Sequence, residues 1–558
     1  MFKLSWATGL VLALLACGGG AGGTDAPDAT DAGRDLVDTA GDVAPDAAPA
    51  DAEPDVPLVP PVPADCRPNS QPFPERPPVA EAPTLPRLHV EGTDIVDESG
   101  AKVALRGINL GGWLIIESWM AGLGTLSQEE LFAAMEQEAD ARGLAALYKD
   151  ARQTNFFQCQ FLLKPQWVCV QEWKAYMQEN AGAEADAVAA FWGWFDEQPW
   201  VYEERTFWRW LEKRFGYAGM LELRQAWRDN YVTELDLERV AALGLNLVRV
   251  PVWYQVLETD QEGENGFVPE GWQRLDRLFT WARRHGVYVM LDLHGAPGGQ
   301  SPWWHQGLEN GGFFFQTPAC VDKAARLWGA IAHYFEDEPH LAGYDLLNEP
   351  AGAATKAEYC DAHQKLYEAV RAEDPDHIVS IEDGYLPPDK MCGPAEMGWT
   401  NAVMQYHDYP AGETADQVVQ SFETKELDTI RNLGDRMGAP LFYGEFNVYP
   451  PTDFEKTDDP ADRWQVEAMD RLLQLFAARG IHWTPWSWKH FSAPSLWGVY
   501  HPEVPGQRID LKTISHEDLK AAFEGMNSSH FLLDEAYGAL LKARAADPVA
   551  PLDLSPSR

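Results

Sequence analysis

The sequence predicts an α/β protein folded as a (β/α)8 TIM barrel, with a long helical insertion after the first strand. Eight apolar, strand-like runs follow one another along the chain, and amphipathic helical stretches separate most of them. Such alternation is typical of a parallel sheet covered by helices. Eight units, with no glycine-rich dinucleotide fingerprint after the first strand, favour a closed barrel over an open nucleotide-binding sheet.

The N-terminus of the 558-residue chain resembles an export signal. Lys3 is followed by an apolar stretch over residues 4–16, which is too short to span a bilayer. The stretch ends in Leu-Leu-Ala-Cys at Cys17, which is similar to the lipobox of bacterial lipoproteins. We therefore expect a signal peptide over residues 1–16 and lipid attachment at Cys17. An ordinary signal peptide with an incidental cysteine is the alternative.

Residues 17–86 are rich in Ala, Pro, Asp and Gly and have little to bury, so we expect a disordered linker. A folded body over residues 87–558 would then be a membrane-anchored lipoprotein at the cell envelope or cell surface, held by its N-terminal lipid only. The formal net charge of −42 argues against nucleic acid as a partner, because an acidic surface repels phosphate.

The folded body begins with a small hairpin from residue 88, predicted to turn at Glu98–Gly100. The first barrel strand is expected within residues 103–113. An insertion over residues 121–232 follows, with eight tryptophans. We predict that it is mostly helical, either a lid that contacts substrate or a self-packed helical hairpin. The other strands are expected within residues 245–254, 287–295, 341–350, 377–384, 402–409, 440–449 and 482–489.

Helices between the strands have recognisable ends. Residues 233–244 start with a capping box at Thr233 and stop at Gly244. Residues 271–286 and 463–480 also stop at glycines. The first of these two carries an apolar stripe made by Trp272, Leu275, Leu278, Phe279 and Ala282.

Six cysteines remain besides Cys17, and none forms a Cys-x-x-Cys pair, so a zinc ribbon is not supported. In an exported protein, disulfides are the default. Cys159 with Cys169 is the most local pair, and the other pairings stay open. The six are Cys66, Cys159, Cys169, Cys320, Cys360 and Cys392.

Polar or aromatic side chains stand near the ends of most predicted strands, where barrel enzymes place their active sites. They are Arg249, His294, Asn348, Glu349, His407, Tyr409, Glu445, Trp486 and Trp488. Two carboxylates across a barrel mouth are suited to glycosidic bond cleavage, in which one protonates the leaving oxygen and the other attacks the anomeric carbon.

We assign Glu349 as the acid/base and Glu445 as the nucleophile. Arg249 is expected to keep Glu445 charged, Tyr409 to donate a hydrogen bond to it, and Asn348 to bond the 2-hydroxyl of the substrate. Glu382 and Asp383 are rival carboxylates, for which we predict a structural hydrogen-bonding role.

Five motifs in strand order resemble glycoside hydrolase family 5, of the cellulase superfamily, over about residues 88–497. They are Val-Arg-Val-Pro-Val (248–252), Leu-Asp-Leu-His-Gly-Ala-Pro-Gly-Gly (291–299), Asn-Glu-Pro (348–350), Tyr-His-Asp-Tyr (406–409) and Tyr-Gly-Glu-Phe (443–446). The resemblance implies a retaining mechanism with the same two glutamates in the same roles, and no cofactor or metal.

Residues 105–119 and 294–300 are similar to the exo-β-1,3-glucanase-like branch of that family. The similarity implies that Glu117 helps to close a pocket on a terminal glucose; a solvated loop acid is the alternative. The chain departs from the branch at residues 301–312, Ser-Pro-Trp-Trp-His-Gln-Gly-Leu-Glu-Asn-Gly-Gly, where the branch has an asparagine-containing loop.

The predicted partner is therefore a β-linked oligo- or polysaccharide. We rank an exo-β-1,3-glucanase-like activity first, an endo-β-1,4-glucanase second and a glycolipid β-glucosidase third. The alternative from another class is a non-catalytic carbohydrate-binding lipoprotein on the same scaffold, which would need neither glutamate. The sequence leaves the oligomeric state open.

Overall fold

The computed structural model describes residues 66–555 except 68, 118–119, 124–127, 155–165, 199–202, 262–263, 309–310, 385, 411, 413, 434–435, 449–463, 492–495, 505–507 and 549. The predicted signal peptide, Cys17 and most of the predicted linker lie outside the described residues. None of the helices in the described part of the chain is long and apolar enough to cross a membrane.

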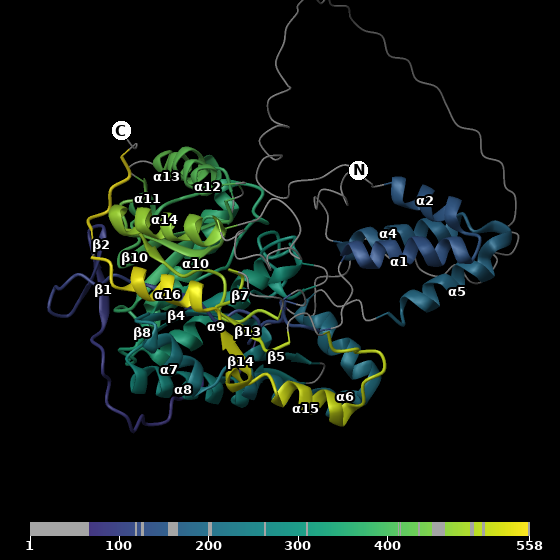
Figure 1. Cartoon of the computed structure of the whole chain (residues 1–558), viewed down its shortest axis with the longest axis horizontal. Coiled ribbons are helices and arrows are strands. Elements are labelled where there is room, and N and C mark those ends of the chain that lie inside the picture. Colours follow the sequence, from purple (N-terminus) through teal and green to yellow (C-terminus); the bar gives the residue numbers. More distant parts are fainter. Residues whose placement is uncertain are drawn as a thin grey trace, which may run out of the picture. The chain divides into compact units, whose positions relative to one another are not determined.

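Eight strands form one sheet in the order β12-β11-β10-β9-β8-β7-β4-β3, and every neighbouring pair is parallel. The two ends of the sheet meet where Arg106 forms a parallel bridge with Trp483, and the amide of Trp483 donates to the carbonyl of Leu105 at 3.1 Å. The sheet therefore closes into a barrel with helices around it (Figure 1), and the predicted fold class is confirmed.

Each strand lies within its predicted run and is shorter than that run. The bounds are β3 (Gly107–Asn109), β4 (Leu247–Trp253), β7 (Tyr288–Gly295), β8 (Leu341–Asp345), β9 (Ile378–Glu382), β10 (Ala402–Asp408), β11 (Leu441–Phe446) and β12 (His482–Trp483). Strands β4, β7, β8, β9, β10 and β11 are buried along their whole length, which explains their nearly continuous apolar sequences.

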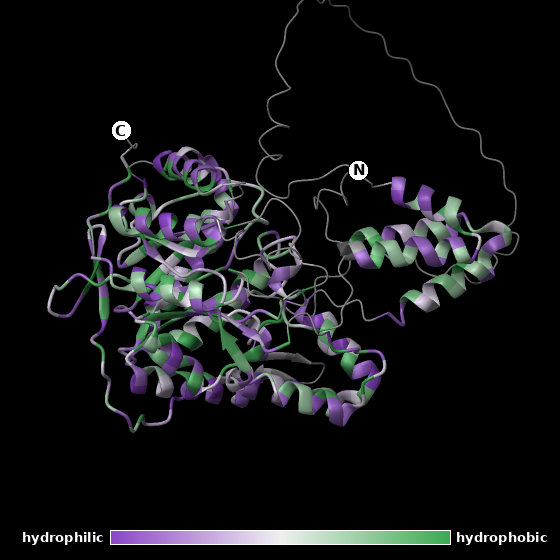
Figure 2. Cartoon of the chain, viewed as in Figure 1, coloured by the Kyte–Doolittle hydropathy of each residue, from purple (hydrophilic) through white to green (hydrophobic). Residues whose placement is uncertain are grey.

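Amphipathic helices connect and surround the strands, and Figure 2 shows hydrophilic and hydrophobic residues alternating along them. The capping box at Thr233 and the left-handed stop at Gly286 are both present, as predicted. The helices are α7 (Glu234–Ala242), α8 (Pro269–His285), α9 (Pro318–Phe335), α10 (Lys356–Glu373), α11 (Pro394–Met397), α12 (Ala415–Ser421), α13 (Leu427–Arg431), α14 (Trp464–Arg479), α15 (His516–Glu524) and α16 (Glu535–Ala545).

The insertion between β3 and β4 contains α1 (Gln128–Ala141), α2 (Ala145–Gln153), α4 (Gln166–Glu179), α5 (Ala185–Phe195) and α6 (Glu204–Asn230). The first four share an apolar core of their own, which includes Tyr148, Trp173 and Phe191. Helix α6 instead joins the main core through residues such as Phe207 and Trp227. Self-packing is thus the arrangement of α1, α2, α4 and α5, whereas α6 packs as part of the barrel.

The N-terminal hairpin pairs β1 (Leu88–Glu91) with β2 (Asp94–Asp97). This pair turns at Gly92, whose φ is +64°, and the chain also turns at Glu98–Gly100 as predicted, since Val96 forms an antiparallel bridge with Lys102. The predicted turn exists as a second one, because the Asp97 carboxylate accepts from the amides of Ser99 and Ala101. Leu88 and Ile95 pack with residues from the starts of the barrel strands, so this hairpin covers the amino-terminal end of the barrel.

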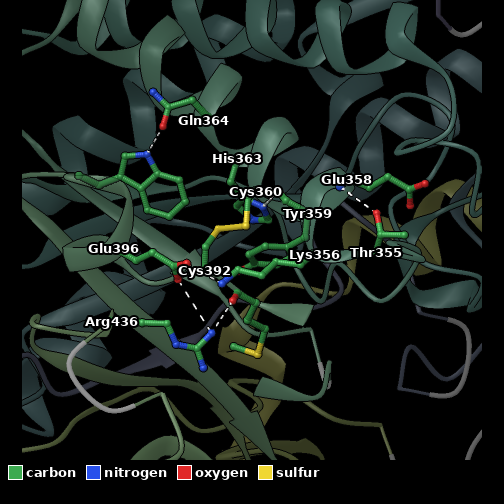
Figure 3. The surroundings of a disulfide bond; sticks show 12 residues. Thr355, Lys356, Glu358, Tyr359, Cys360, His363, Gln364, Cys392, Glu396 and Arg436 are labelled. Atoms are coloured by element: carbon green, nitrogen blue, oxygen red, sulfur yellow. Dashed lines mark hydrogen bonds and ion pairs between the residues drawn. A yellow bond between two sulfur atoms is a disulfide. The ribbon is translucent and has the colours of Figure 1, made fainter. Parts of the chain in front are cut away.

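Two disulfides are present among the described residues, Cys66–Cys320 and Cys360–Cys392. Cys169 is disulfide-bonded as well, and the predicted pairing with Cys159 falls outside the described residues. Figure 3 shows Cys360 of α10 bonded to Cys392, with Glu396 nearby. Glu396 pairs with Lys356 at 2.5 Å, so a disulfide and an ion pair together hold the segment after β9 against α10.

The short remaining elements are two hairpins and several single-turn helices. The hairpins pair β5 (Glu258–Gln261) with β6 (Glu264–Phe267) and β13 (Tyr500–Pro502) with β14 (Phe531–Leu533). One of the single turns, η4 (Trp304–Gln306), lies in the loop after β7 and contributes to the site described below.

Candidate active site

Glu349 and Glu445 lie together at the carboxyl end of the barrel. Glu349 follows β8, and Glu445 is the penultimate residue of β11. One oxygen of each carboxylate and one nitrogen of His407 all lie within 4.8 Å of one another. Both glutamates are buried. Carboxyl groups about 5–5.5 Å apart are typical of retaining glycosidases, and wider pairs of inverting ones.

Glu445 accepts hydrogen bonds on both carboxylate oxygens. Arg249 Nη1 donates to Oε1 at 2.7 Å, and the Tyr409 hydroxyl donates to Oε2 at 2.8 Å. Burial and the Glu445 charge raise the pKa of Tyr409 well above its usual range, so its hydroxyl stays a donor. The two predicted contacts of Glu445, with Arg249 and with Tyr409, are therefore both present.

Arg249 holds a fully buried cluster of acids beneath the site. Its guanidinium lies 3.0 Å from Asp292, 2.8 Å from Asp345 and 2.8 Å from Glu382. Burial, followed by neighbouring charges, raises the pKa of Asp292 and of Glu382 well above the usual range. One guanidinium therefore does not keep all of these carboxylates charged at once, and the cluster holds protons at pH values where isolated acids would not.

Glu349 is surrounded by imidazoles instead of a guanidinium. His407 Nδ1 lies 2.9 Å from its Oε1, and His305 Nε2 lies 3.1 Å from its Oε2. Its backbone φ is +43°, a conformation that is uncommon outside glycine. The amide of Glu349 donates to Glu382 Oε2 at 2.7 Å, which fixes this strained segment.

These surroundings set the protonation of Glu349. Burial by itself raises the pKa of the carboxyl, but His305 and His407 outweigh burial and lower the pKa to about 2. The free site therefore favours the carboxylate. A general acid must carry a proton when substrate is bound, so the proton has to reach Glu349 from a neighbour or from the substrate-bound environment.

His294 and Asn348 border the same space. His294 Nδ1 lies 2.7 Å from Asp292 Oδ2, and burial lowers the pKa of His294 to about 4, so the ring is neutral at pH 7. Asn348 Oδ1 accepts from Arg249 at 2.8 Å, whereas its buried Nδ2 has no hydrogen-bond partner among the described residues. An amide held in this way presents a fixed donor to a sugar hydroxyl.

Aromatic rings line one side of the site. Trp486 stacks on His294 with ring centroids 5.6 Å apart, and Trp497 stacks on Tyr409 at 5.7 Å. Trp486, Trp497 and Met120 form a small apolar cluster that Tyr409 packs against. Glu117 is buried near it, and its charge contributes to the raised pKa of Tyr409.

The structure does not bring Trp488 to this cluster. Its indole Nε1 donates to Asp236 of α7 at 2.7 Å, and its ring packs 4.8 Å from that of Tyr500. Strand β12 ends at Trp483, so the alternation of a regular strand no longer governs the direction of the side chains that follow.

The family model for the cellulases of glycosyl hydrolase family 5 matches residues 208–492. The chain belongs to this family. It is therefore a glycoside hydrolase by descent.

Two curated relatives and one solved structure illustrate the similarity. The chain is 25% identical to a β-xylosidase from Phanerodontia chrysosporium over 414 residues. The aligned region covers 72% of this chain and 70% of that protein. It is 30% identical to a probable glucan 1,3-beta-glucosidase A from Aspergillus fumigatus over 316 residues. That aligned region covers 49% of this chain and 73% of that protein. A β-glucanase from Saccharophagus degradans, solved in complex with cellotetraose, is 14% identical with a TM-score of 0.43 and covers 85% of this chain and 98% of that one.

Sequence reasoning missed several groups that this family 5 site uses. Asp292 and Asp345 are inward-facing acids within apolar runs, so their sequence positions did carry a signal. His305 is different. It belongs to the loop at residues 301–312 that departs from the glucanase-like branch, and nothing in the local pattern indicates that it reaches Glu349.

Two groups in the described part of the chain have oxygen or nitrogen atoms close enough to hold an ion. Asp292, Asp345 and Glu382 form one, and Arg249 contacts all three. Glu349, His407 and Glu445 form the other, but both oxygens of Glu445 already accept hydrogen bonds. Arg249 neutralises part of the first group, although Asp292 Oδ1 and Asp345 Oδ1 have no hydrogen-bond partner among the described residues, and we assign no metal to either group.

Proposed function

We propose that the protein is a retaining β-glycosidase that cleaves β-glucosidic bonds by double displacement. The observation that supports this most directly is the short gap between one oxygen of Glu349 and one of Glu445, within 4.8 Å, with Arg249 and Tyr409 hydrogen-bonded to Glu445. In this mechanism Glu445, which accepts from Arg249 and Tyr409, is the attacking carboxylate, and Glu349, which lies beside two imidazoles, is the acid/base.

In the first step, a Glu445 oxygen forms a bond to the anomeric carbon while the bond to the leaving oxygen breaks. Protonated Glu349 gives its proton to that oxygen, so a neutral alcohol leaves and Glu349 becomes a carboxylate. Arg249 and Tyr409 hold Glu445 in line for attack. The free Nδ2 of Asn348 would donate to the 2-hydroxyl, a contact that strengthens as positive charge develops on the sugar.

In the second step, Glu349 removes a proton from water, and the resulting hydroxide oxygen attacks the anomeric carbon. The ester bond to Glu445 breaks, and the carboxylate of Glu445 is regenerated. The sugar keeps its β configuration because two inversions occur at one carbon. Trp486 and His294 would provide the flat face on which the sugar ring rests.

For the substrate we rank an exo-acting β-1,3-glucanase-like activity first. Two observations support this ranking: the 30% identical relative is a probable glucan 1,3-beta-glucosidase A, and Glu117 is buried near Tyr409. An endo-β-1,4-glucanase is second and a glycolipid β-glucosidase third. A product profile against laminarin, cellulose, mannan and xylan separates them, because exo action on laminarin releases glucose from the first minutes.

The mechanism is tested by trapping. A 2-fluoro β-glucoside with a good leaving group should inactivate the wild type and leave the label on Glu445. Glu445→Gln should neither turn over an aryl β-glucoside nor take up the label. A label on Glu382 would refute the assignment, and sugar binding without turnover by wild type would favour the alternative of a non-catalytic carbohydrate-binding protein.

We also propose that the protein is exported and anchored by lipid at Cys17, at the cell envelope or cell surface. The support is the lipobox-like Leu-Leu-Ala-Cys and the Ala/Pro/Asp-rich segment after it. In a bacterial host, the wild type should partition with membranes and Cys17→Ala should not. Recovery of both in the same soluble fraction would contradict lipid anchoring.

A further inference from the structure

The carboxylate of Glu349 has an imidazole on each oxygen. His407, which faces Oε1, belongs to strand β10, whereas His305, which faces Oε2, belongs to the η4 turn in the loop after β7. A general acid must present one oxygen to the glycosidic oxygen. His407 makes a hydrogen bond, whereas His305 Nε2 lies within ion-pair distance but has no hydrogen-bond partner among the described residues, so the His305 contact is the one that substrate can displace.

Three glycines pack tightly against Gln306, the residue that follows His305, and fix the backbone there. Gln306, the next residue, is fully buried. A Cβ atom at Gly295 would lie 2.4 Å from the Gln306 carbonyl oxygen, and one at Gly311 would lie 2.0 Å from its side-chain Nε2. Gly299, with φ +72°, meets the same side chain. Because only glycine fits at these positions, the loop is packed to present His305 where it stands.

The insertion also supports this loop. The backbone amide of Arg205, at the start of α6, donates to the Gly307 carbonyl at 3.2 Å. The Arg205 guanidinium is directed elsewhere, to the Tyr254 hydroxyl at 3.3 Å. Glu204 Oε2 accepts from the Ile116 amide at 2.8 Å, next to Glu117. Helix α6 thus joins the two loops that carry His305 and Glu117.

His305 is 14% exposed and packs among rings, which makes a charge on it costly unless it is paired. Trp303 and His294 lie with ring centroids 6.0 Å from it, and Trp304 at 6.3 Å. The titratable groups that face it are Glu349 from the end of β8, His294 from β7, His407 from β10 and Glu445 from β11. Burial lowers the pKa of His305, and Glu349 opposes that effect most strongly.

We propose that His305 is a positioning residue that stores the catalytic proton beside Glu349 in the substrate-free site. This rests on the proposed function. In the protonated fraction of the free site, which is the catalytically competent one, the proton lies on His305 Nε2 and faces Oε2 of ionised Glu349. Substrate that enters displaces water and approaches Oε2, and the proton moves from Nε2 to Oε2. His305 becomes neutral and Glu349 becomes the acid that protonates the leaving oxygen.

The cycle balances without another reactant. The leaving alcohol departs with the stored proton, and Glu349 is left as a carboxylate. Water then gives one proton to Glu349 and its hydroxyl to the sugar. That proton returns to His305 when product leaves. A merely structural His305 would hold the loop in shape but would not change how tightly the pair binds its proton.

The pair has a distinct pH signature. A carboxylate and an imidazole that share one proton bind it more tightly than the carboxylate does alone. His305→Gln should therefore move the alkaline limb of kcat/KM to lower pH. A shift of about one pH unit lowers kcat/KM about tenfold on the alkaline side of the limb. The loss should disappear on acidification to pH 5.

The experiment compares two aryl β-glucosides, because kcat/KM reports the step in which the aglycone leaves. Phenyl β-glucoside needs a proton on its leaving group, and 2,4-dinitrophenyl β-glucoside does not. For His305→Gln we expect a tenfold loss at pH 7 with the first, recovery at pH 5, and a change below threefold with the second. His530→Asn, at an exposed histidine, is the matched control and should behave as wild type.

Equal losses on both substrates at every pH would show a structural role and overturn the proposal. An unchanged alkaline limb would also overturn it. If the wild type hydrolyses neither glucoside, the proposed function is wrong, and the proposal for His305 has to be tested without turnover. A histidine NMR titration then decides without turnover: the pKa of His305 should fall in Glu349→Gln relative to wild type, and an equal or higher pKa would refute proton sharing.

Discussion

Glu445 and Glu349 lie within 4.8 Å of each other, yet the two sides of the site are built from different chemistry. Arg249 and Tyr409 hold Glu445, and neither changes its charge near neutral pH. Two histidines lie beside Glu349 instead, and imidazole is the side chain whose unperturbed pKa is nearest to neutral pH. In a double displacement, one carboxylate must remain an anion and the other must give and take a proton. The neighbours of each glutamate match its proposed task.

The two sides also differ in their origin along the chain. Arg249, Tyr409 and Glu445 come from strands or their immediate ends, which the closed sheet holds in register. His305 comes from a loop that depends on a buried glutamine, three glycines and the start of α6. The charged side is therefore fixed by the barrel itself. On the proton-exchanging side, His407 comes from strand β10, whereas His305 comes from a loop, an element that varies more easily between relatives.

Replacement of Arg249 by lysine should give the largest loss of activity, because Arg249 holds Glu445 on the charged side of the site. A lysine keeps the charge but cannot contact Glu445, Asp345 and Glu382 in one plane. We expect kcat/KM to fall about 10³-fold, to a similar extent for both leaving groups. The free energy of unfolding should fall by about 3–5 kcal/mol, because buried carboxylates lose their partner. Arg277→Lys, at an exposed ion pair, is the control. A loss confined to phenyl β-glucoside would contradict this role.

Glu349→Gln should affect only the proton-exchanging side. Hydrolysis of phenyl β-glucoside should fall by about 10²–10⁴-fold, the range for general acid catalysis, while kcat/KM for 2,4-dinitrophenyl β-glucoside changes little. Azide should restore turnover of the activated substrate and yield a β-glucosyl azide, because an anion needs no base. Absence of any azide product would argue that Glu349 is not the base of the second step.

Tyr409→Phe should give a smaller change on the charged side. It removes one hydrogen bond to Glu445, and hydrogen bonds to charged groups contribute about 1.5–3 kcal/mol, or roughly 10–100-fold in rate. The stacking on Trp497 remains, so the fold should be unaffected. The reduction should be the same for both leaving groups. A larger loss on phenyl β-glucoside would place Tyr409 on the acid side instead.

The barrel and the charged side could be read from the sequence, because strand period and strand ends determine both. Apolar runs define the eight strands, and Arg249, Glu349 and Glu445 stand at positions that a parallel barrel must bring to one rim. The surroundings of Glu349 could not be read in the same way. The contact with His305 depends on how Gln306 packs against glycines distributed over the loop, and no local periodicity encodes that.

Trp488 and the insertion are two further cases in which a sequence pattern does not determine tertiary contacts. The prediction for Trp488 assumed a strand that continues beyond residue 483, whereas β12 has only two residues. In the insertion, helix periodicity predicted helices but not their partners. Four of them pack on each other, and α6 packs on the barrel, a division that depends on tertiary contacts.

The smallest expected effect concerns buried histidines and stability. Burial lowers the pKa of His294 and of His482 to about 4, so the folded protein binds these protons more weakly than the unfolded chain, where the value is 6.5. Stability from these groups is fully present above pH 6.5 and is lost as the pH falls towards 4.

His482 Nδ1 accepts from the Leu105 amide at 3.0 Å, far from the glutamates at the opposite end of the strands. His482→Asn keeps an acceptor there but cannot titrate. Thermal melts should show a shallower loss of Tm between pH 6.5 and 4 for this variant, with the alkaline limb of kcat/KM unchanged. A shift of that limb would mean that histidines outside the acid side also set the protonation of Glu349.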